Sequence, residues 1–436
     1  MAISGRLPLL LVIGVVPVIA WPAPLTVLGW VLLVIAAGAL DLLLAVRPDR
    51  LRIVRELPGS VRLTESVTSR LTVTNPERRT ARLQLRDAWP PSAQPAADRP
   101  QVVLPAGEAR RQATRLTPTR RGDLAAAAVT VRSFGPLGLV ARQKSLAVPG
   151  VLRVLPEFRS RAHLPYRLAR LRELDGQAAV HVRGQGTEFD SLREYAIGDD
   201  VRSIDWRASA RATRTMVRTW RPERDRHILV VLDSSRWAAG RIGGTNGIPD
   251  QLRFDTGIEV CLLMAALGAA SGDRMSLLVA DQRVRLRLPG GGKGSVLARF
   301  ANGLSPIEPS LTETDWSLVA GEVDQLCRQR SLVILVTGLD PALYADGLGT
   351  VLARLGHDHQ VLVAHVTDPA ETTRLTDAAT ATDVYDAAAG ARLWLATQAL
   401  AGRVSRMGVE VVQRDPDHLA PAVCDAYLAL KAAGRL

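Results

Sequence analysis

The stretch HILVVLD, His227–Asp233, decides the fold of the C-terminal half of this 436-residue chain. It is a nearly continuous apolar run that ends at a carboxylate, as is typical of a parallel strand buried on both faces. Strands are also predicted over 274–280, 284–288, 331–336, 360–366 and 409–412, and helices over 254–270, 295–304, 316–329, 343–355, 391–407 and 418–432. This alternation predicts an α/β domain over 227–436, with a mainly parallel sheet covered by helices on both faces. Ligand sites of such sheets lie at the carboxyl ends of the strands, where Asp233 lies.

The N-terminal segment 1–46 contains two apolar stretches. Residues 7–21 are apolar throughout but short for a membrane span, and residues 25–46 are apolar except for Asp41. About 20 helical residues cross the hydrocarbon of a bilayer, so the second stretch is long enough for one span. The protein is therefore expected to be membrane-anchored.

Two interpretations of the first stretch remain open. It is either the first helix of a two-helix transmembrane hairpin, although it contains Pro8 and Pro17, or a cleaved signal peptide that begins at Arg6 and ends at residues 18–20. We favour the hairpin, because a signal peptide and a stop-transfer segment would have to touch here.

Positive charges predict the orientation of the chain in the membrane. The connector between the two apolar stretches carries none, whereas the second stretch is followed by arginines at 47, 50, 52 and 55. Because positively charged flanks stay in the cytoplasm, we expect a multi-pass cell-membrane protein with two spans and with residues 47–436 in the cytoplasm. The three scattered cysteines agree with a reducing compartment.

Residues 47–155 predict an all-β, sandwich-like module. Short alternating strands follow one another at 52–55, 69–74, 82–85, 101–104 and 127–132, separated by turn residues such as Asn75-Pro76 and Gly135-Pro136. Nothing in this segment is typical of a catalytic site. We therefore interpret it as a spacer or a protein-binding module.

Composition argues against several classes of enzyme and of ligand. The net charge is +12, but only three of the 55 basic residues are lysines, and the arginines are interleaved with acids along the chain. Aromatic residues make up only 4% of the chain, so a basic face with aromatic platforms for nucleic acid is not indicated. There is neither a phosphate-binding GxxxxGK[ST] loop nor an HExxH motif, and three cysteines cannot form a disulfide framework.

The segment 156–226 lies between the β module and the α/β domain and carries the most distinctive run, GQGTEFDSLREYAIGDDVRSIDWRASAR, at 184–211. The pattern G-x-E-F-x-x-L-R-E-Y-x-x-G-D-D-x-R-x-I-D-W-x-A-S-A-R resembles the signature of domain-of-unknown-function family 58. These are MoxR-associated proteins with a von Willebrand factor A-like domain. The resemblance covers nearly the whole chain, most specifically 184–235, and it implies that 227–436 is a Rossmann-like von Willebrand factor A-like domain.

The run at 184–211 interleaves acids with arginines. Such carboxylates could bind a hard cation, or guanidinium groups could pair with them. Pairing lowers the pKa of a carboxyl and leaves neither an acid nor a base poised near neutrality, so we favour an ion-pair network or docking surface over catalysis. Trp206 is expected to pack on the neighbouring sheet. The predicted partner-binding residues are Glu188, Arg193, Tyr195, Asp199, Asp200, Arg202, Asp205, Trp206 and Arg211.

The resemblance also implies a metal-ion-dependent adhesion site, made by a D-x-S-x-S motif, a threonine and a later aspartate. Asp233 and Ser235 keep the first part of the motif, and Thr314 suits the threonine. Trp237 stands at the second serine position, and Thr337-Gly338 stands where the family has a serine–aspartate pair, with Asp340 two residues late.

We interpret this site as degraded. Its candidate metal ligands are Asp233, Ser235 and Thr314, and no cofactor other than Mg²⁺ is suggested. The alternative is that Asp233 caps a helix or holds a neighbouring loop.

These observations favour a scaffold or adaptor rather than an enzyme. The resemblance implies a link to a MoxR-type AAA+ ATPase, and to a transglutaminase-like membrane protein, in complex assembly or envelope processes. Two alternatives are a metal-dependent hydrolase that uses the acids of 184–211 and a binder of anionic surfaces or nucleic acid driven by arginine.

Overall fold

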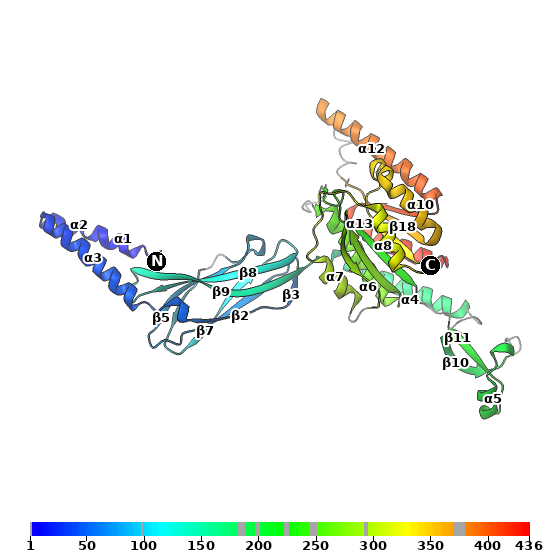
Figure 1. Cartoon of the computed structure of the whole chain (residues 1–436), viewed down its shortest axis with the longest axis horizontal. Coiled ribbons are helices and arrows are strands. Elements are labelled where there is room, and N and C mark those ends of the chain that lie inside the picture. Colours follow the sequence, from blue (N-terminus) through cyan, green and yellow to red (C-terminus); the bar gives the residue numbers. More distant parts are fainter. Residues whose placement is uncertain are drawn as a thin grey trace. The chain divides into compact units, whose positions relative to one another are not determined.

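The computed structural model describes residues 2–96, 99–181, 188–196, 201–221, 226–243, 251–291, 295–369 and 380–436. The chain divides into two compact units, Met1–Glu157 and Phe158–Leu436 (Figure 1). The boundary falls close to position 155, where the predicted β module ends.

The first unit begins with helices α1 (Arg6–Ile13), α2 (Val15–Ala20) and α3 (Pro24–Leu44). Among the described residues, the helical stretch 24–50 that contains α3 is the one helix long and apolar enough to cross a membrane, and Arg6–Ala20 is a shorter apolar helix. At 1.5 Å per residue, the 21 residues of α3 extend over about 31 Å, close to the thickness of the hydrocarbon core.

Trp30 of α3 packs into the break between α1 and α2. The Gly14 N–H bonds to the Leu11 carbonyl in a tightened turn, and the Trp30 indole N–H donates to the carbonyl of Leu10 at 3.2 Å. A Cβ at position 14 would lie 2.1 Å from the indole nitrogen, so only glycine fits there. Satisfying a backbone carbonyl in this way is valuable where water is scarce.

The β module of the first unit has two sheets. The larger has the order β1-β9-β8-β5-β6, with β3 also paired to β9, and the smaller has the order β2-β4-β7. The strands are β1 (Ala2–Ile3), β2 (Arg52–Glu56), β3 (Ser60–Arg62), β4 (Val67–Thr74), β5 (Ala81–Ala88), β6 (Gln101–Leu104), β7 (Ala109–Leu116), β8 (Gly122–Phe134) and β9 (Val140–Leu155). Alternate residues of both sheets, among them Leu71, Leu83 and Val131, meet in one apolar core.

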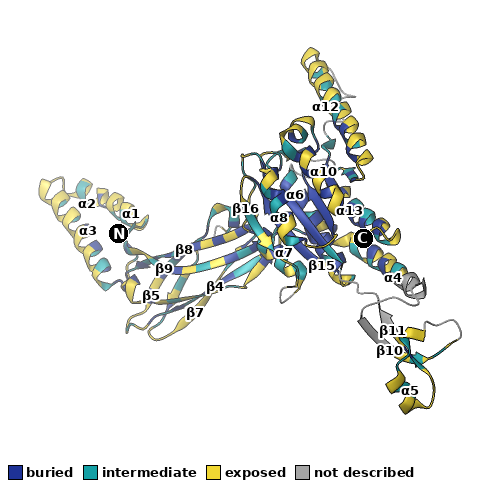
Figure 2. Ribbon diagram, turned by 45° about the vertical axis from the view of Figure 1, so that its right-hand side comes forward, coloured by how far each residue is buried: buried dark blue, intermediate teal, exposed yellow. Residues whose placement is uncertain are grey.

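The second unit is built on a six-stranded sheet with the order β16-β15-β12-β17-β18-β19. Every neighbouring pair is parallel except β15 and β16. The strands are β12 (His227–Asp233), β15 (Arg274–Ala280), β16 (Val284–Leu288), β17 (Leu332–Val336), β18 (Gln360–Val366) and β19 (Glu410–Arg414). The central strands are buried on both faces, which their continuous apolar runs require (Figure 2).

Helices cover both faces of this sheet. Leu229 and Val231 of β12 point to the face packed by α8, α10 and α12, whereas Gly257 of α6 contacts Leu232 on the other face, where α13 lies beside α6. These helices are α6 (Arg253–Ala270), α7 (Val296–Leu304), α8 (Trp316–Leu326), α9 (Pro341–Leu343), α10 (Gly349–Asp358), α12 (Ala381–Arg406) and α13 (Pro416–Ala432).

Three helices differ from the sequence prediction. The helix predicted over 343–355 is interrupted by Gly347, whose φ of +116° no other residue adopts easily. The helix predicted over 391–407 begins at Ala381, where Thr380 and Asp383 form a capping box. Helix α4 (Leu164–His181) was not predicted.

The remaining elements of the second unit are short. The antiparallel pairs are β10 (Glu188–Glu194) with β11 (Met216–Arg221), and β13 (Arg241–Ile242) with β14 (Gln251–Leu252). Between β10 and β11 the chain forms a 3₁₀ turn at Val201–Ser203 and helix α5 (Trp206–Ala212).

Candidate functional site

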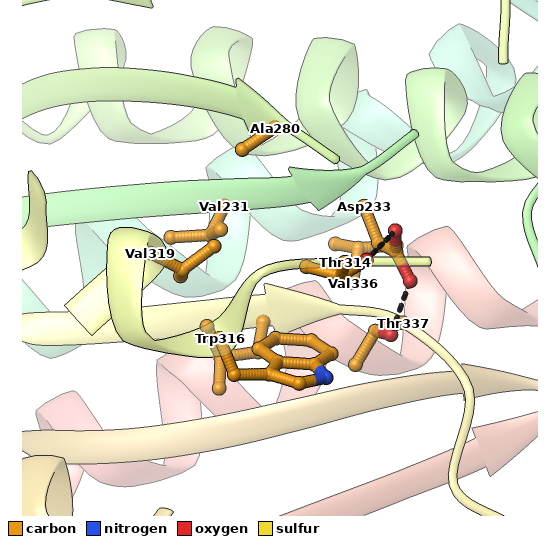
Figure 3. A pocket seen from close by; sticks show the side chains of 9 residues that line it. Val231, Asp233, Ala280, Thr314, Trp316, Val319, Val336 and Thr337 are labelled. Atoms are coloured by element: carbon orange, nitrogen blue, oxygen red, sulfur yellow. Dashed lines mark hydrogen bonds between the residues drawn. The ribbon is translucent and has the colours of Figure 1, made fainter. Parts of the chain in front are cut away.

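Asp233 lies at the carboxyl end of β12, and its side chain is buried with 3% of the residue exposed. Its Oδ1 accepts hydrogen bonds from the Ser235 backbone N–H at 2.8 Å and from the Thr314 hydroxyl at 2.7 Å. Its Oδ2 accepts a hydrogen bond from the Thr337 hydroxyl at 2.6 Å (Figure 3). Asp233 thus joins the loop after β12, the segment before α8 and the end of β17.

Burial raises the pKa of Asp233, because a low-dielectric site disfavours the charged form. The bonds from Thr337, Ser235 and Thr314 offset part of this rise. Beneath the carboxyl, the recess lined by Val231, Trp316 and their neighbours leaves no room for a water molecule. Asp233 is therefore a satisfied interior carboxyl that holds loops together.

The Ser235 hydroxyl differs from the other side chains around Asp233 in its hydrogen bonding. It lies close enough to the Asp233 carboxyl to help lower its pKa, yet its Oγ is buried and makes no hydrogen bond of standard geometry within the described part of the chain. Sequence reasoning selected Asp233, Ser235 and Thr314, and the structure brings them together. It missed the bond from Thr337, whose position at the end of a strand beside β12 was the available signal.

The donors around Asp233 do not fit a resident Mg²⁺. Both carboxylate oxygens are already occupied by donors, and the two threonine hydroxyls that could ligate a cation point their hydrogens at that carboxylate. In the described residues, no group of three or more His, Cys, Asp or Glu side chains could hold a metal. Mg²⁺ demands near-ideal octahedral coordination by oxygen, which one buried carboxylate and the Ser235 hydroxyl cannot supply.

Trp237 and Gly338 follow β12 and β17 in the chain and lie beside each other. The Trp237 ring lies 5.7 Å from the His365 ring and 5.3 Å from the Arg253 guanidinium carbon. A Cβ at position 338 would lie 2.6 Å from the Trp237 indole nitrogen, so the tryptophan fits only beside glycine. Trp237 and Gly338, which replace residues of the motif expected from the resemblance, are thus in contact with each other.

His365, which contacts the Trp237 ring, is uncharged. It accepts a hydrogen bond from the Leu339 N–H at 3.0 Å. Burial, assisted by the Arg253 guanidinium, lowers the pKa of His365 to about 4. The imidazole is therefore uncharged at neutral pH, and its ring contacts the Trp237 ring without a charge of its own.

A second carboxyl, Asp281, follows the neighbouring strand β15. It accepts a hydrogen bond from the Ser310 hydroxyl at 2.9 Å and forms an ion pair with Arg285 at 2.9 Å. Asp340, considered above as a late metal ligand, instead caps α9 by accepting a hydrogen bond from the Leu343 N–H at 3.0 Å. Asp281 also accepts from the Ser234 hydroxyl at 3.4 Å, so it holds the residue next to Asp233, whereas its carboxylate makes no hydrogen bond with the Asp233 side chain within the described residues.

The predicted partner-binding residues lie on β10, β11 and the turns between them. Asp205 caps α5 by accepting from the N–H groups of Arg207 and Ala208 at 3.0 Å, and it forms an ion pair with Arg218 at 2.8 Å. The Ala208 N–H, followed by Arg218, holds the pKa of Asp205 below its usual value. Asp205 is thus a structural anchor of this segment.

The other predicted residues of this segment differ in exposure. Trp206 does not pack on a sheet as expected, because it is the first residue of α5 and 71% of it is exposed. Arg202 and Arg211 are also exposed.

Two other predicted residues make hydrogen bonds to the backbone of this segment. The Arg193 guanidinium donates to the Glu194 carbonyl at 3.2 Å, and the Tyr195 N–H donates to the Thr215 carbonyl at 2.8 Å.

Two of the predicted residues, Asp199 and Asp200, lie outside the described residues. Glu188 is the first residue of β10 and lies opposite Arg221 of β11. Among the described residues of the predicted docking surface, the exposed ones include Trp206, Arg202 and Arg211.

The chain is thus a multidomain protein with an apolar N-terminal helix, a β module and a mainly parallel α/β domain. The chain belongs to the family described as "Protein of unknown function DUF58", whose model matches residues 191–415. The family resemblance of the 184–211 run is therefore confirmed.

The curated relatives have no established function. "Uncharacterized protein Rv1480" of Mycobacterium tuberculosis and "Uncharacterized protein Mb1516" of Mycobacterium bovis are each 26% identical to this chain over 199 residues. Each match covers 45% of this chain and 60% of the relative, so the chain spans less than two thirds of the length of these relatives.

Similar solved structures include the CARDB domain of the PF1109 protein from Pyrococcus furiosus, with 13% identity, a TM-score of 0.20, and coverage of 26% of this chain and 92% of that chain. An uncharacterized membrane spanning protein from Vibrio fischeri is 13% identical, with a TM-score of 0.18, and covers 48% of this chain and 98% of that chain.

Proposed function

We propose that this protein is a membrane-anchored cytoplasmic adaptor that binds protein partners through its von Willebrand factor A-like domain and the 184–211 segment before it. The observation that carries the proposal is the closed Asp233 cluster. Its carboxylate is occupied by the Thr314 and Thr337 hydroxyls, and the Trp237 ring nearby in the chain is packed against His365, so this sheet edge suits binding better than chemistry. The position of Asp233 after the central strand and the family resemblance together support the von Willebrand factor A-like assignment.

The membrane anchor is proposed to be a two-helix hairpin. Ala2 and Ile3 form β1, which pairs with Ala141 and Val140 of β9, so the chain enters α1 beside the same β module that it rejoins after α3. The Ser4 hydroxyl donates to the Gly138 carbonyl at 2.6 Å and strengthens this attachment. A hairpin requires both of its ends on one side of the membrane, and the arginines after α3 favour the cytoplasmic side.

Cysteine labelling tests this topology. The native residues Cys261, Cys327 and Cys424 are all buried, which leaves an introduced thiol as the reactive one. In intact cells, a membrane-impermeant maleimide should label Ala23→Cys in the connector and should label Gly59→Cys only after lysis. Equal labelling of both positions in intact cells would contradict the hairpin.

The partner is proposed to be a MoxR-type AAA+ ATPase, docking on the exposed surface around Trp206; the family resemblance also suggests a transglutaminase-like membrane protein. An exposed tryptophan between arginines is a common anchor of protein interfaces. The hydrolase alternative is less favoured, because Asp205 is engaged by two backbone N–H groups and Arg218.

A pull-down with the detergent-solubilised full chain tests the partner. The purified MoxR-type ATPase of the same organism should bind wild type and the control Trp394→Ala, which removes another half-exposed tryptophan on α12, but should bind Trp206→Ala poorly. Absence of binding to wild type would refute the partner. Unchanged binding to Trp206→Ala would refute the surface.

A further inference from the structure

A cavity of about 670 Å³ opens at the amino edge of the central sheet, at the opposite end of the strands from Asp233. Its walls come from the first residues of β12 and β15, the end of β16 and the loop between α8 and β17. The polar side chains that line it include His227, Arg274, Arg287, Arg328, Arg330 and Ser331. The cavity is thus bordered by four arginines, and none of its lining residues is an acid.

Within the described part of the chain, few carboxylates neutralise these arginines. Arg287 pairs with Glu322 at 3.2 Å and also donates to Gln325. The nearby Asp324 is paired with Arg354 instead. The guanidinium groups of Arg274, Arg328 and Arg330 make no ion pair with the described residues. Several like charges around one cavity repel each other, and an anion between them would relieve that repulsion.

The floor of the cavity is held in place by a hydrogen-bonded chain. His227 Nε2 lies 2.7 Å from the Ser276 hydroxyl, which accepts from the Gly290 N–H at 2.8 Å. On its other side, His227 Nδ1 lies 3.4 Å from the Ser331 hydroxyl, which donates to the Gln329 carbonyl at 2.8 Å. These contacts fix the imidazole between the strands, so the walls that carry Arg274 and Arg330 are preformed.

We propose that this cavity binds a small soluble compound with two or more phosphate groups. Guanidinium groups bind phosphate oxygens through two parallel hydrogen bonds, and a compound with several phosphates can engage arginines from three walls at once. The volume lies within the range of small-molecule sites. The cavity is far in sequence from the 184–211 segment, and this binding is independent of the proposed adaptor function.

Calorimetric titration of the full chain in detergent with inorganic pyrophosphate, at constant ionic strength, tests the proposal. Wild type should bind one pyrophosphate saturably. The double variant Arg274→Gln/Arg330→Gln should bind at least about tenfold more weakly, since two charge-assisted contacts are lost. The control Arg241→Gln/Arg414→Gln removes the same charge elsewhere and should bind as wild type does. All of these variants should keep the thermal midpoint of wild type, because each of the substituted arginines is exposed.

Three results would overturn the proposal. The first is no saturable heat with wild type. The second is equal weakening in the test and control pairs, which would indicate attraction to net charge alone. The third is binding only to vesicles that contain phosphatidic acid and not to pyrophosphate, which would assign the arginines to a lipid surface.

Discussion

The carboxylate of Asp41, in the last two turns of α3, accepts a hydrogen bond of 2.7 Å from the backbone N–H of Leu139, in the turn between β8 and β9. The same carboxylate accepts from the N–H groups of Leu137 at 2.8 Å and Val140 at 3.0 Å. Asp41 is completely buried. The single acid of the apolar stretch is therefore a clamp between the anchor helix and the β module.

This clamp predicts a specific stability loss for Asp41→Ala. Removing the carboxylate leaves three backbone N–H groups without their acceptor, and each buried donor left unsatisfied costs about 1–3 kcal/mol. We expect Asp41→Ala to lower the free energy of unfolding in detergent by about 3 kcal/mol or more, and Asp41→Asn to lower it less. Leu40→Ala, at an exposed neighbouring position, serves as the control and should change little. A loss no larger than that of the control would contradict the clamp.

The Asp233 cluster predicts how stability depends on pH. Burial raises the native pKa of its carboxyl above the ordinary 3.8, so the neutral form is favoured more in the native state than in the unfolded state. The contribution of Asp233 to stability is full below pH 3.8 and is lost as the pH rises through the raised native value. As the pH increases through this range, the unfolding free energy of wild type should fall relative to that of Asp233→Asn. The fall should be about 1.4 kcal/mol for each unit by which the native pKa exceeds the unfolded value. Urea unfolding of both proteins across this range measures the difference, and a constant difference would contradict the assignment.

Magnesium should leave the protein unchanged. The Asp233 oxygens are saturated by Thr314, Thr337 and the Ser235 N–H, so adding or chelating Mg²⁺ should not shift the thermal midpoint of wild type or of Asp233→Ala. Differential scanning fluorimetry with Mg²⁺ and with a chelator checks this expectation. An upward shift in wild type that is absent from Asp233→Ala would show that the site does bind the metal.

Particular residues show what could be predicted from the sequence. The apolar run His227–Asp233 predicts the central strand, because only a strand buried on both faces tolerates such a run. Asp233 and Thr314 come together, since the ends of adjacent strands and the loops beside them meet at one sheet edge. The candidate residues taken from the resemblance therefore lie close together, whereas their role as metal ligands stays a prediction.

The features that the sequence did not predict depend on tertiary structure. Trp206 was expected to pack on the neighbouring sheet, but it is exposed at the start of a short helix, which hydrophobicity alone does not reveal. The clamp of Asp41 depends on a turn about 98 residues away, which no local pattern indicates. The stacking of Trp237 on His365 and the space left by Gly338 are likewise tertiary relationships.

The pairing of Trp237 with Gly338 gives the sharpest mutational test. In Gly338→Ala the new Cβ would meet the indole at 2.6 Å and a methyl of Leu343 at 2.5 Å, so we expect a loss of about 1–3 kcal/mol in unfolding free energy. Trp237→Ala alone should also destabilise the protein, by removing the stack on His365. In the double variant the indole clash is gone, and the two losses should therefore sum to less than their separate values, with a coupling energy of about 0.5–3 kcal/mol. Additive losses in a double-mutant cycle by chemical unfolding would mean that Gly338 is needed for Leu343 or for the backbone, and not for Trp237.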